Sequence, residues 1–215
     1  MSTTTGTGTL KERQRAERET LILQTAEELL LEKGYYEMSM DEIAARVGIS
    51  KGTVYLHFPG KEELVVALLQ RRMETMHRLF GDIFRSEASP TAKLQAFLDH
   101  VYGGMTSQHY QMFFSLYQNP EMRTRWLEKK ASLQALQDDI ARQLTDVFEE
   151  GKASGNFDRT IPTTVMLHML TNLLSPRSYE QWVVQGEMAM ADVVQHLSQF
   201  FFKGIAAQSS HERKP

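Results

Sequence analysis

The side chains best suited to chemistry in this sequence form the run Ser50-Lys51-Gly52-Thr53. This run places a hydroxyl, a cation, a residue without a side chain and a second hydroxyl next to one another. Ser50 is placed to cap a helix that begins at Lys51, so these groups would lie at a helix N-terminus, which favours anions. DNA phosphates and base edges fit that description. A second interpretation stays open, because helical hairpins that only pack are common.

The residues around this run predict two short helices joined by a tight turn. Ser39 and Glu42 form a capping box, so a helix should start there and end at Gly48, which can take the left-handed conformation. A second helix should run over Lys51–Phe58. Ala44 is small where the two helices must approach each other. The expected product is a helix-turn-helix.

The remainder of the chain predicts an all-α fold of about nine helices, because proline is scarce and apolar residues recur at helical spacing. We expect helix ends or starts at Gly34, Ser89-Pro90, Asn119-Pro120 and Gly151, with Gly103-Gly104 as an interruption. The longer predicted helices are Leu10–Glu32, the run from Pro59-Gly60 to Arg85, the run from Asn119 to Gly151, Pro162–Leu174 and Ala189–Ile205.

These patterns divide the chain into four predicted segments. Residues 1–9 are rich in Ser, Thr and Gly and should form a disordered leader, and residues 209–215 should form a tail. Residues 10–60 should form the helix-turn-helix domain. Residues 61–208 should form a second helical domain.

Composition limits the possible functions of the 215 residues. A formal net charge of −3 argues against a protein that coats nucleic acid by bulk electrostatics, so any DNA binding must come from local placement of cations. The sequence has no cysteine, no apolar run long enough to cross a membrane, and none of the usual catalytic or phosphate-binding motifs. We therefore expect a cytoplasmic protein without membrane association, cofactor, metal or enzymatic activity.

The helix-turn-helix stretch resembles the tetracycline-repressor (TetR-like) family of transcriptional regulators. The resemblance rests on IAARVGISKGTVYLHFPGKEELVVAL, preceded by a first helix and Gly34-Tyr35, and it is specific over about residues 15–70. It implies an N-terminal three-helix DNA-binding domain, a helical domain for ligand binding and dimerisation, and ligand-controlled repression.

The same resemblance implies the DNA contacts. Lys51, Gly52 and Thr53 would lie at the edge of the major groove, where Lys and Thr contact bases. The full set of candidates is Ser39, Arg46, Ser50, Lys51, Gly52, Thr53, Tyr55, His57 and Lys61, of which Tyr55, His57 and Lys61 would contact phosphates. The chain departs from the common pattern at Leu56, where an aromatic residue is frequent, and at Gly60, where a capping side chain is usual.

Residues 105–126 are unusually rich in methionine and aromatic side chains. Such a stretch commonly fills a core, but in the resembled family the middle helices enclose a ligand cavity, and adaptable Met beside rigid rings suits a mainly apolar ligand. The candidate ligand contacts are Met105, Tyr110, Phe113, Phe114, Tyr117, Trp126, Met166, Met169 and Asn172.

The two C-terminal helices are apolar on most sides, which favours self-association into a homodimer. The candidate interface residues are Leu170, Leu174, Val194, Leu197 and Phe201. The resulting hypothesis is a homodimeric repressor that binds a palindromic double-stranded DNA operator and is released by a small, mainly apolar effector. Two alternatives remain open: a helical enzyme or carrier, and a DNA-binding protein controlled by a protein partner.

Overall fold

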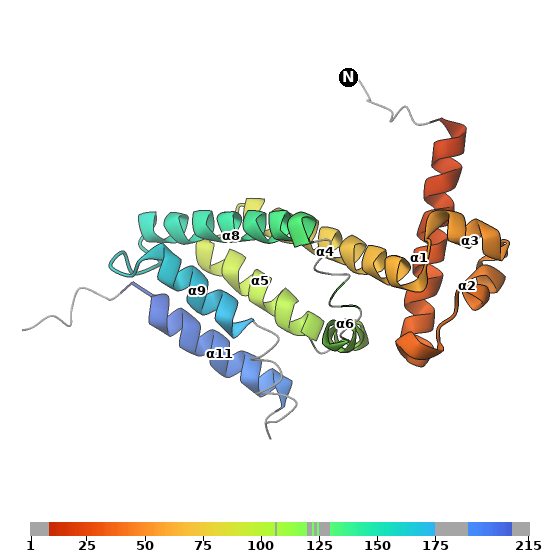
Figure 1. Cartoon of the computed structure of the whole chain (residues 1–215). Coiled ribbons are helices and arrows are strands. Elements are labelled where there is room, and N and C mark those ends of the chain that lie inside the picture. Colours follow the sequence, from red (N-terminus) through yellow and green to blue (C-terminus); the bar gives the residue numbers. More distant parts are fainter. Residues whose placement is uncertain are drawn as a thin grey trace, which may run out of the picture. The chain divides into compact units, whose positions relative to one another are not determined.

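The structure is a computed structural model that describes residues 9–105, 107–119, 122, 124, 130–174 and 189–207. The described residues fold into helices without a β-strand, which confirms the predicted all-α class (Figure 1). The elements are α1 (Leu10–Glu37), α2 (Met40–Val47), α3 (Lys51–His57), α4 (Lys61–Arg85), α5 (Pro90–Met105), α6 (Gln108–Gln118), α8 (Lys130–Ala153), α9 (Thr163–Leu173) and α11 (Met190–Ile205).

The chain divides into two compact units. The first comprises Met1–Arg72 with Ser115–Lys129, and the second comprises Met73–Phe114 with Lys130–Pro215. The helix α4 contributes residues to both units, because it runs without a break from Lys61 to Arg85.

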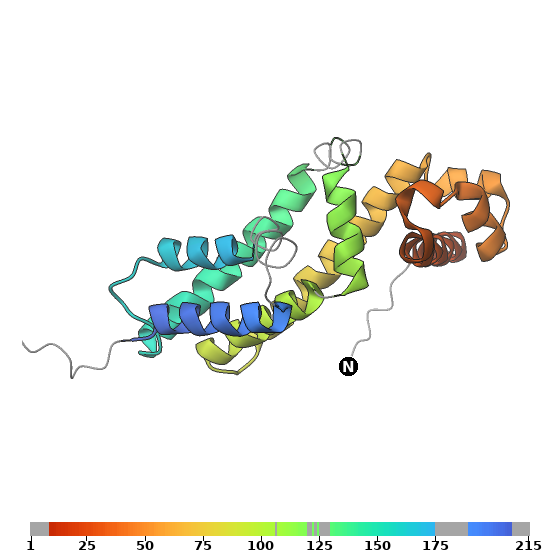
Figure 2. The same ribbon diagram turned by 90° about the horizontal axis from the view of Figure 1, so that it is seen from below.

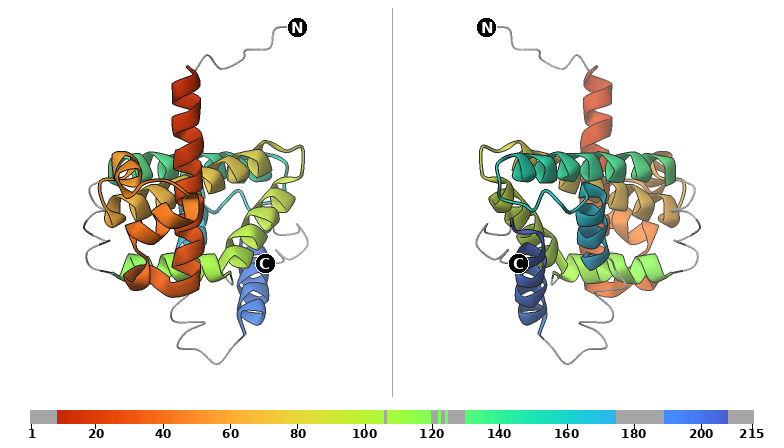
Figure 3. Two further views of the ribbon diagram at one scale, coloured as in Figure 1. Left: turned by 90° about the vertical axis from the view of Figure 1, so that its right-hand side faces the viewer. Right: turned by 90° about the vertical axis from the view of Figure 1, so that its left-hand side faces the viewer.

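The first unit is organised by α1, with α2 and α3 lying beside its C-terminal half (Figures 1 and 3). Thr9 caps α1 in a capping box with Glu12, so this residue belongs to the helix rather than to the predicted leader. Gly34 breaks the helix as predicted, since its φ of 80° is left-handed, but a further turn follows as far as Glu37. Consequently α1 is both better anchored and longer than the sequence suggested.

The core of the first unit joins one face of α1 to the following helices. Ile22, Ala26 and Leu29 on α1 are completely buried, and so are Ile43 on α2 and Val54 on α3. Each of the larger side chains, Ile, Leu and Val, contributes roughly 1.5–3 kcal/mol through burial of apolar surface. This small core therefore fixes how α2 and α3 lie against α1.

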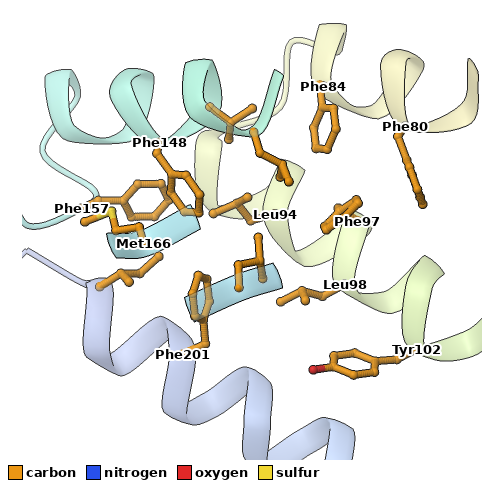
Figure 4. Close-up of a cluster of buried hydrophobic side chains, with 14 residues drawn as sticks. Phe80, Phe84, Leu94, Phe97, Leu98, Tyr102, Phe148, Phe157, Met166 and Phe201 are labelled. Carbon is orange, nitrogen blue, oxygen red and sulfur yellow. The ribbon is translucent and has the colours of Figure 1, made fainter. Parts of the chain in front are cut away.

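The second unit is built around a larger apolar core that α4, α5, α8, α9 and α11 share. Its aromatic rings belong to Phe80, Phe84, Phe97, Tyr102, Phe148, Phe157 and Phe201 (Figure 4). The rings of Phe80 and Phe97 lie 4.8 Å apart in an edge-to-face arrangement, which adds to the energy of burial. Figures 1 and 2 both show α9 and α11 side by side on one side of this core.

Three predicted helix boundaries, two in the second unit and one at Asn119 in the first, have different outcomes. The start at Ser89-Pro90 is confirmed, because the Ser89 hydroxyl accepts the Ala92 N–H at the start of α5. The predicted interruption at Gly103-Gly104 is wrong, because α5 continues through both glycines to Met105. At Asn119 the side-chain oxygen accepts the Met122 N–H, as an N-cap does, while Pro120 lies outside the described residues.

The predicted stop at Gly151 is wrong as well. The helix α8 continues to Ala153, and the left-handed residue that follows is Gly155, with a φ of 79°. Gly151 is instead the point where the buried ring of Phe157 lies against the helix, since a Cβ atom there would overlap that ring. The residue is therefore glycine for close packing rather than for a turn.

Candidate functional site

The helix-turn-helix is set by short-range hydrogen bonds. The Ser39 hydroxyl accepts the Glu42 N–H at 3.2 Å, and the Ser50 hydroxyl accepts the Thr53 N–H at 3.2 Å, so each helix begins on its own capping side chain. Between them Gly48 is left-handed, with a φ of 75°, and its N–H donates to Ala44 and Ala45. The turn is therefore fixed by three residues that the sequence had marked.

The helix α3 has an inner and an outer face. Val54 and Phe58 are buried, whereas Tyr55 is exposed and Leu56 is 80% exposed. At Gly52 a Cβ atom would meet only the Ser50 hydroxyl, at 3.9 Å, so the space beyond that glycine is open. The outer face of α3 is thus free to approach another molecule closely.

The Lys51 ammonium is held between two side chains. Its Nζ lies 2.6 Å from Oδ1 of Asp41, in the first turn of α2, and 5.9 Å from the centre of the Tyr55 ring. The hydrogen bond with Asp41 raises the pKa of Lys51 above its ordinary value. A neighbouring hydrogen bond engages Thr53, whose hydroxyl lies 2.8 Å from that of Ser50.

Arg46 is committed to contacts within the protein. Its guanidinium donates to both carboxylate oxygens of Glu32 on α1, at 2.8 and 2.6 Å, and it lies 3.4 Å from Glu42. The hydrogen bond from Arg46 lowers the pKa of Glu32, and the one from Lys33 lowers the pKa of Glu42. The predicted contact between Arg46 and DNA would have to compete with this bidentate pair.

Lys61, at the start of α4, is also engaged. Its Nζ donates to the Tyr36 carbonyl at 3.2 Å and lies 4.4 Å from the centre of the Tyr35 ring. Burial lowers the pKa of Lys61. The Tyr35 hydroxyl donates to Glu62, so Lys61 belongs to a small network that ties α1 to α4.

His57 does not have the exposed position that a phosphate contact suggests. Its side chain is only 6% exposed, and its Nδ1 is buried without a hydrogen-bond partner, 3.9 Å from a carboxylate oxygen of Glu19. The ring faces inward because it packs beside Phe58, which belongs to the core of the first unit. Tyr55 is therefore the better placed of the two predicted aromatic contacts.

The candidate ligand residues fall into three groups. Met166 is buried in the core of the second unit and Tyr110 packs against that core. Met169 is 60% exposed and Asn172 is exposed too, so neither lines an enclosed space. The side chains of the others lie outside the described part of the chain: Met105, Phe113, Phe114, Tyr117 and Trp126.

Two buried hydroxyls in the second unit were missed by the sequence analysis. The hydroxyls of Tyr102 on α5 and Ser198 on α11 are buried and have no hydrogen-bond partner among the described residues, and burial raises the pKa of Tyr102. Tyr102 follows Leu94 and Leu98 at a spacing of four, so helical periodicity marked it as an inward residue. Ser198 also lines a groove of about 360 Å³ between α5 and α11.

The predicted dimer residues are mostly part of the protomer's own core. Leu170 and Phe201 are buried there, and Leu174, Val194 and Leu197 pack against it. The prediction that Leu170 and Phe201 face a partner is therefore corrected, because the same apolar stripe is needed to close the fold. The exposed apolar side chains of α9 and α11 are Val165, Met169 and Phe200.

None of the described helices is long and apolar enough to cross a membrane. Within the same part of the chain, no group of three or more His, Asp or Glu residues is placed to hold a metal ion.

Comparison with known proteins adds two matches to family models. The model described as bacterial regulatory proteins, tetR family, matches residues 22–68. The model described as tetracyclin repressor-like, C-terminal domain, matches residues 87–205. Together the two matches span the helix-turn-helix and most of the second unit.

Individual relatives agree with these matches. The HTH-type transcriptional activator FasR of Mycolicibacterium smegmatis is 33% identical over 102 residues, which is 46% of this chain and 47% of FasR. The fatty acid metabolism regulator protein of Bacillus subtilis is 22% identical over 167 residues, which is 77% of this chain and 84% of that protein.

Solved structures show the same fold. A transcriptional regulator of the TetR/AcrR family from Thermobifida fusca superposes with a TM-score of 0.72 at 23% identity, over 87% of this chain and 98% of that chain. The ketosteroid transcriptional regulator KstR2 of Mycobacterium tuberculosis superposes with a TM-score of 0.62 at 21% identity, over 89% of this chain and 96% of that chain.

Proposed function

Because the chain belongs to the TetR family of bacterial regulatory proteins, we propose that it represses transcription as a homodimer on a palindromic DNA operator. We propose further that a small, mainly apolar effector releases it from DNA. The observation that carries the proposal is the helix-turn-helix, in which α3 keeps a buried inner face and an exposed outer face. An exposed recognition helix held rigidly by a small core is what major-groove binding requires.

The small number of unengaged cations on one subunit supports the proposal that the protein binds DNA as a dimer. Arg46, Lys51 and Lys61 are each engaged by groups of their own chain, so one subunit offers few unengaged cations to phosphates among its predicted contacts. Two subunits related by a two-fold axis double those contacts across a palindrome. The exposed apolar residues Met169 and Phe200 of α9 and α11 support this pairing, because a second copy would cover them.

The second unit supports an effector that is apolar with one polar group. Its core is dominated by aromatic rings, which suits an apolar ligand. Within it the Tyr102 hydroxyl is buried without a partner, and such a group costs free energy until it finds an acceptor. The names of relatives point the same way, since one is a fatty acid metabolism regulator and another a ketosteroid transcriptional regulator.

The helix α4 is the element through which an effector would act on DNA binding. Phe80 and Phe84, near its C-terminal end, belong to the core of the second unit, while Lys61 opens it in the first unit. A ligand that repacks the two rings would shift α4, and the shift would alter the separation of the two recognition helices in a dimer. In this proposal the helix α4 couples effector binding to DNA binding.

The test is binding of purified protein to DNA from around its own gene, compared with scrambled DNA at physiological salt. We expect a salt-sensitive complex with the stoichiometry of a dimer on the native DNA only. Transcription from that DNA in vitro then separates repression from activation, because a repressor lowers the yield of transcript. Absence of binding to any of the fragments would favour the enzyme or carrier alternative.

A further inference from the structure

We propose that Lys51 and Asp41 act together as one donor–acceptor unit that reads a G·C base pair in the operator. The inference rests on the proposed function, because it needs sequence-specific binding by the outer face of α3. It assigns a role to Asp41, which carries a negative charge at a surface that must approach DNA.

The geometry places the two groups side by side and in reach of a ligand. Lys51 Nζ lies 2.6 Å from Asp41 Oδ1, and both side chains remain largely exposed, at 56% and 64%. Lys51 is the first residue of α3, and Asp41 lies in the first turn of α2, so the turn at Gly48 fixes their spacing. The centre of the Tyr55 ring lies 5.9 Å from the same ammonium.

The other predicted contacts are less able to read bases. Arg46 is held by Glu32 through two hydrogen bonds, and Lys61 donates to the Tyr36 carbonyl. The Thr53 hydroxyl shares a hydrogen bond with Ser50. The Lys51–Asp41 pair also offers a donor and an acceptor together, and its side chains, at 56% and 64%, are more exposed than those of Arg46 and Glu32, at 36% and 49%.

The chemistry of the pair matches one order of groups in the major groove. A Lys ammonium has three N–H donors, so contact with Asp41 leaves two, while the Asp41 carboxylate keeps unused acceptor sites. A G·C pair presents two acceptors, guanine N7 and O6, followed by the donor N4–H₂ of cytosine. An A·T pair presents an acceptor (adenine N7), a donor (adenine N6–H₂) and an acceptor (thymine O4) in that order. The donor of adenine would therefore face one of the two remaining N–H donors of Lys51. The pair therefore selects G·C.

The carboxylate also explains why the pair should discriminate rather than merely attract. Asp41 offsets the charge of Lys51, so the pair adds little to the sequence-independent attraction of phosphates. At a base pair without an amino group in the right place, the carboxylate would face acceptors and lose its hydration without replacement. The pair thus penalises wrong sequences.

The test starts from duplexes that the wild-type protein selects out of a random pool. Dissociation constants are then measured by fluorescence anisotropy for the selected duplex, a scrambled duplex, and every symmetric single-base-pair substitution. For the wild type we expect one position in each half-site at which replacing G·C by A·T weakens binding roughly 10-fold. In Asp41→Ala that discrimination should fall below about 3-fold while the other positions keep theirs.

Two further variants make the result specific. Asp41→Asn keeps the size of the side chain but offers both a donor and an acceptor, so we expect the preferred base pair at that position to shift towards A·T. Asp82→Ala is the matched control, because Asp82 forms an exposed ion pair of similar length, with Arg85 at 2.7 Å on α4. This control should leave the whole profile unchanged.

Three outcomes overturn the proposal and are distinguishable. An Asp41→Ala profile identical to the wild-type profile would reduce Asp41 to a surface ion pair. A uniform gain on all duplexes, scrambled DNA included, would mean that Asp41 only shields Lys51 from phosphates. A wild-type protein without preference for its selected duplex would remove the proposed function together with this inference. Thermal denaturation by circular dichroism shows whether each variant is folded. If Asp41→Ala is unfolded, the comparison between Asp41→Asn and the wild type decides the proposal.

Discussion

Replacing Gly151 by alanine should destabilise the second unit, although alanine is the better helix former. A Cβ atom on Gly151 overlaps two carbons of the Phe157 ring and lies 2.9 Å from its Cγ, closer than the 3.0 Å that real Cβ atoms keep. The ring has little room to retreat, because Phe157 is buried and its ring lies 6.1 Å from that of Phe148. Its backbone is held too, since the neighbouring Asp158 N–H donates to Ile205 at 2.8 Å.

Two opposing terms set the size of this effect. Alanine gains about 1 kcal/mol over glycine inside a helix. Overpacking of a filled core costs about 1–3 kcal/mol, and expelling the Phe157 ring would cost roughly 1.5–3 kcal/mol of burial. When the gain is subtracted from either cost, we expect Gly151→Ala to lower the free energy of unfolding by up to about 2 kcal/mol, which corresponds to as much as roughly 8 °C in Tm for a protein of this length.

The matched control is Gly103→Ala in α5. This glycine is also helical and a Cβ atom there would have nothing within 4 Å, so only the gain in helix propensity remains. We expect it to raise the free energy of unfolding by about 0.5–1 kcal/mol. Urea denaturation followed by circular dichroism measures both variants. If Gly151→Ala proved as stable as Gly103→Ala, the close approach of Phe157 to α8 would be wrong.

Three other predictions concern DNA binding, assembly and pH. Lys61→Ala should weaken binding to all duplexes alike and reduce the slope of log affinity against log salt by about one unit, measured by anisotropy titration; a loss confined to one sequence would contradict a phosphate contact. Phe200→Glu, on a side chain that is 77% exposed, should release folded monomers in sedimentation, whereas Leu170→Glu, in the core, should unfold the protein. A Phe200→Glu variant that stayed dimeric would move the interface elsewhere. The hydrogen bond from His77, at 2.6 Å, lowers the pKa of Asp139, so this carboxylate contributes stability above its unfolded pKa of about 3.8 that is lost as the pH falls through the lower, folded value. Urea midpoints between pH 7 and pH 2 should fall less for Asp139→Asn than for the wild type, and parallel curves would refute the contribution.

The helix-turn-helix was determined by the sequence because its signals are local. Ser39, Gly48 and Ser50 act on backbone groups within four residues, so their hydrogen bonds follow from residue type and spacing alone. The exposure of Tyr55 beside the buried Val54 follows in the same way from helical periodicity. These features also carried the resemblance to the family, and the comparisons confirmed it.

Only the tertiary structure decided what each cation and each apolar residue contacts. Arg46 meets Glu32 across 14 positions, and no spacing rule assigns a partner to a long flexible side chain at that distance. Helical periodicity placed Leu170 and Phe201 on apolar helix faces. A face that is buried in the protomer's own core and a face that is buried against a second copy have the same apolar pattern in the sequence. The prediction for Gly151 was wrong for a related reason. The sequence does not distinguish a glycine that ends a helix from a glycine that leaves space for the ring of another residue. Hydrogen bonds between neighbours along the chain are fixed by local geometry, whereas packing partners are set by how all the helices share one core.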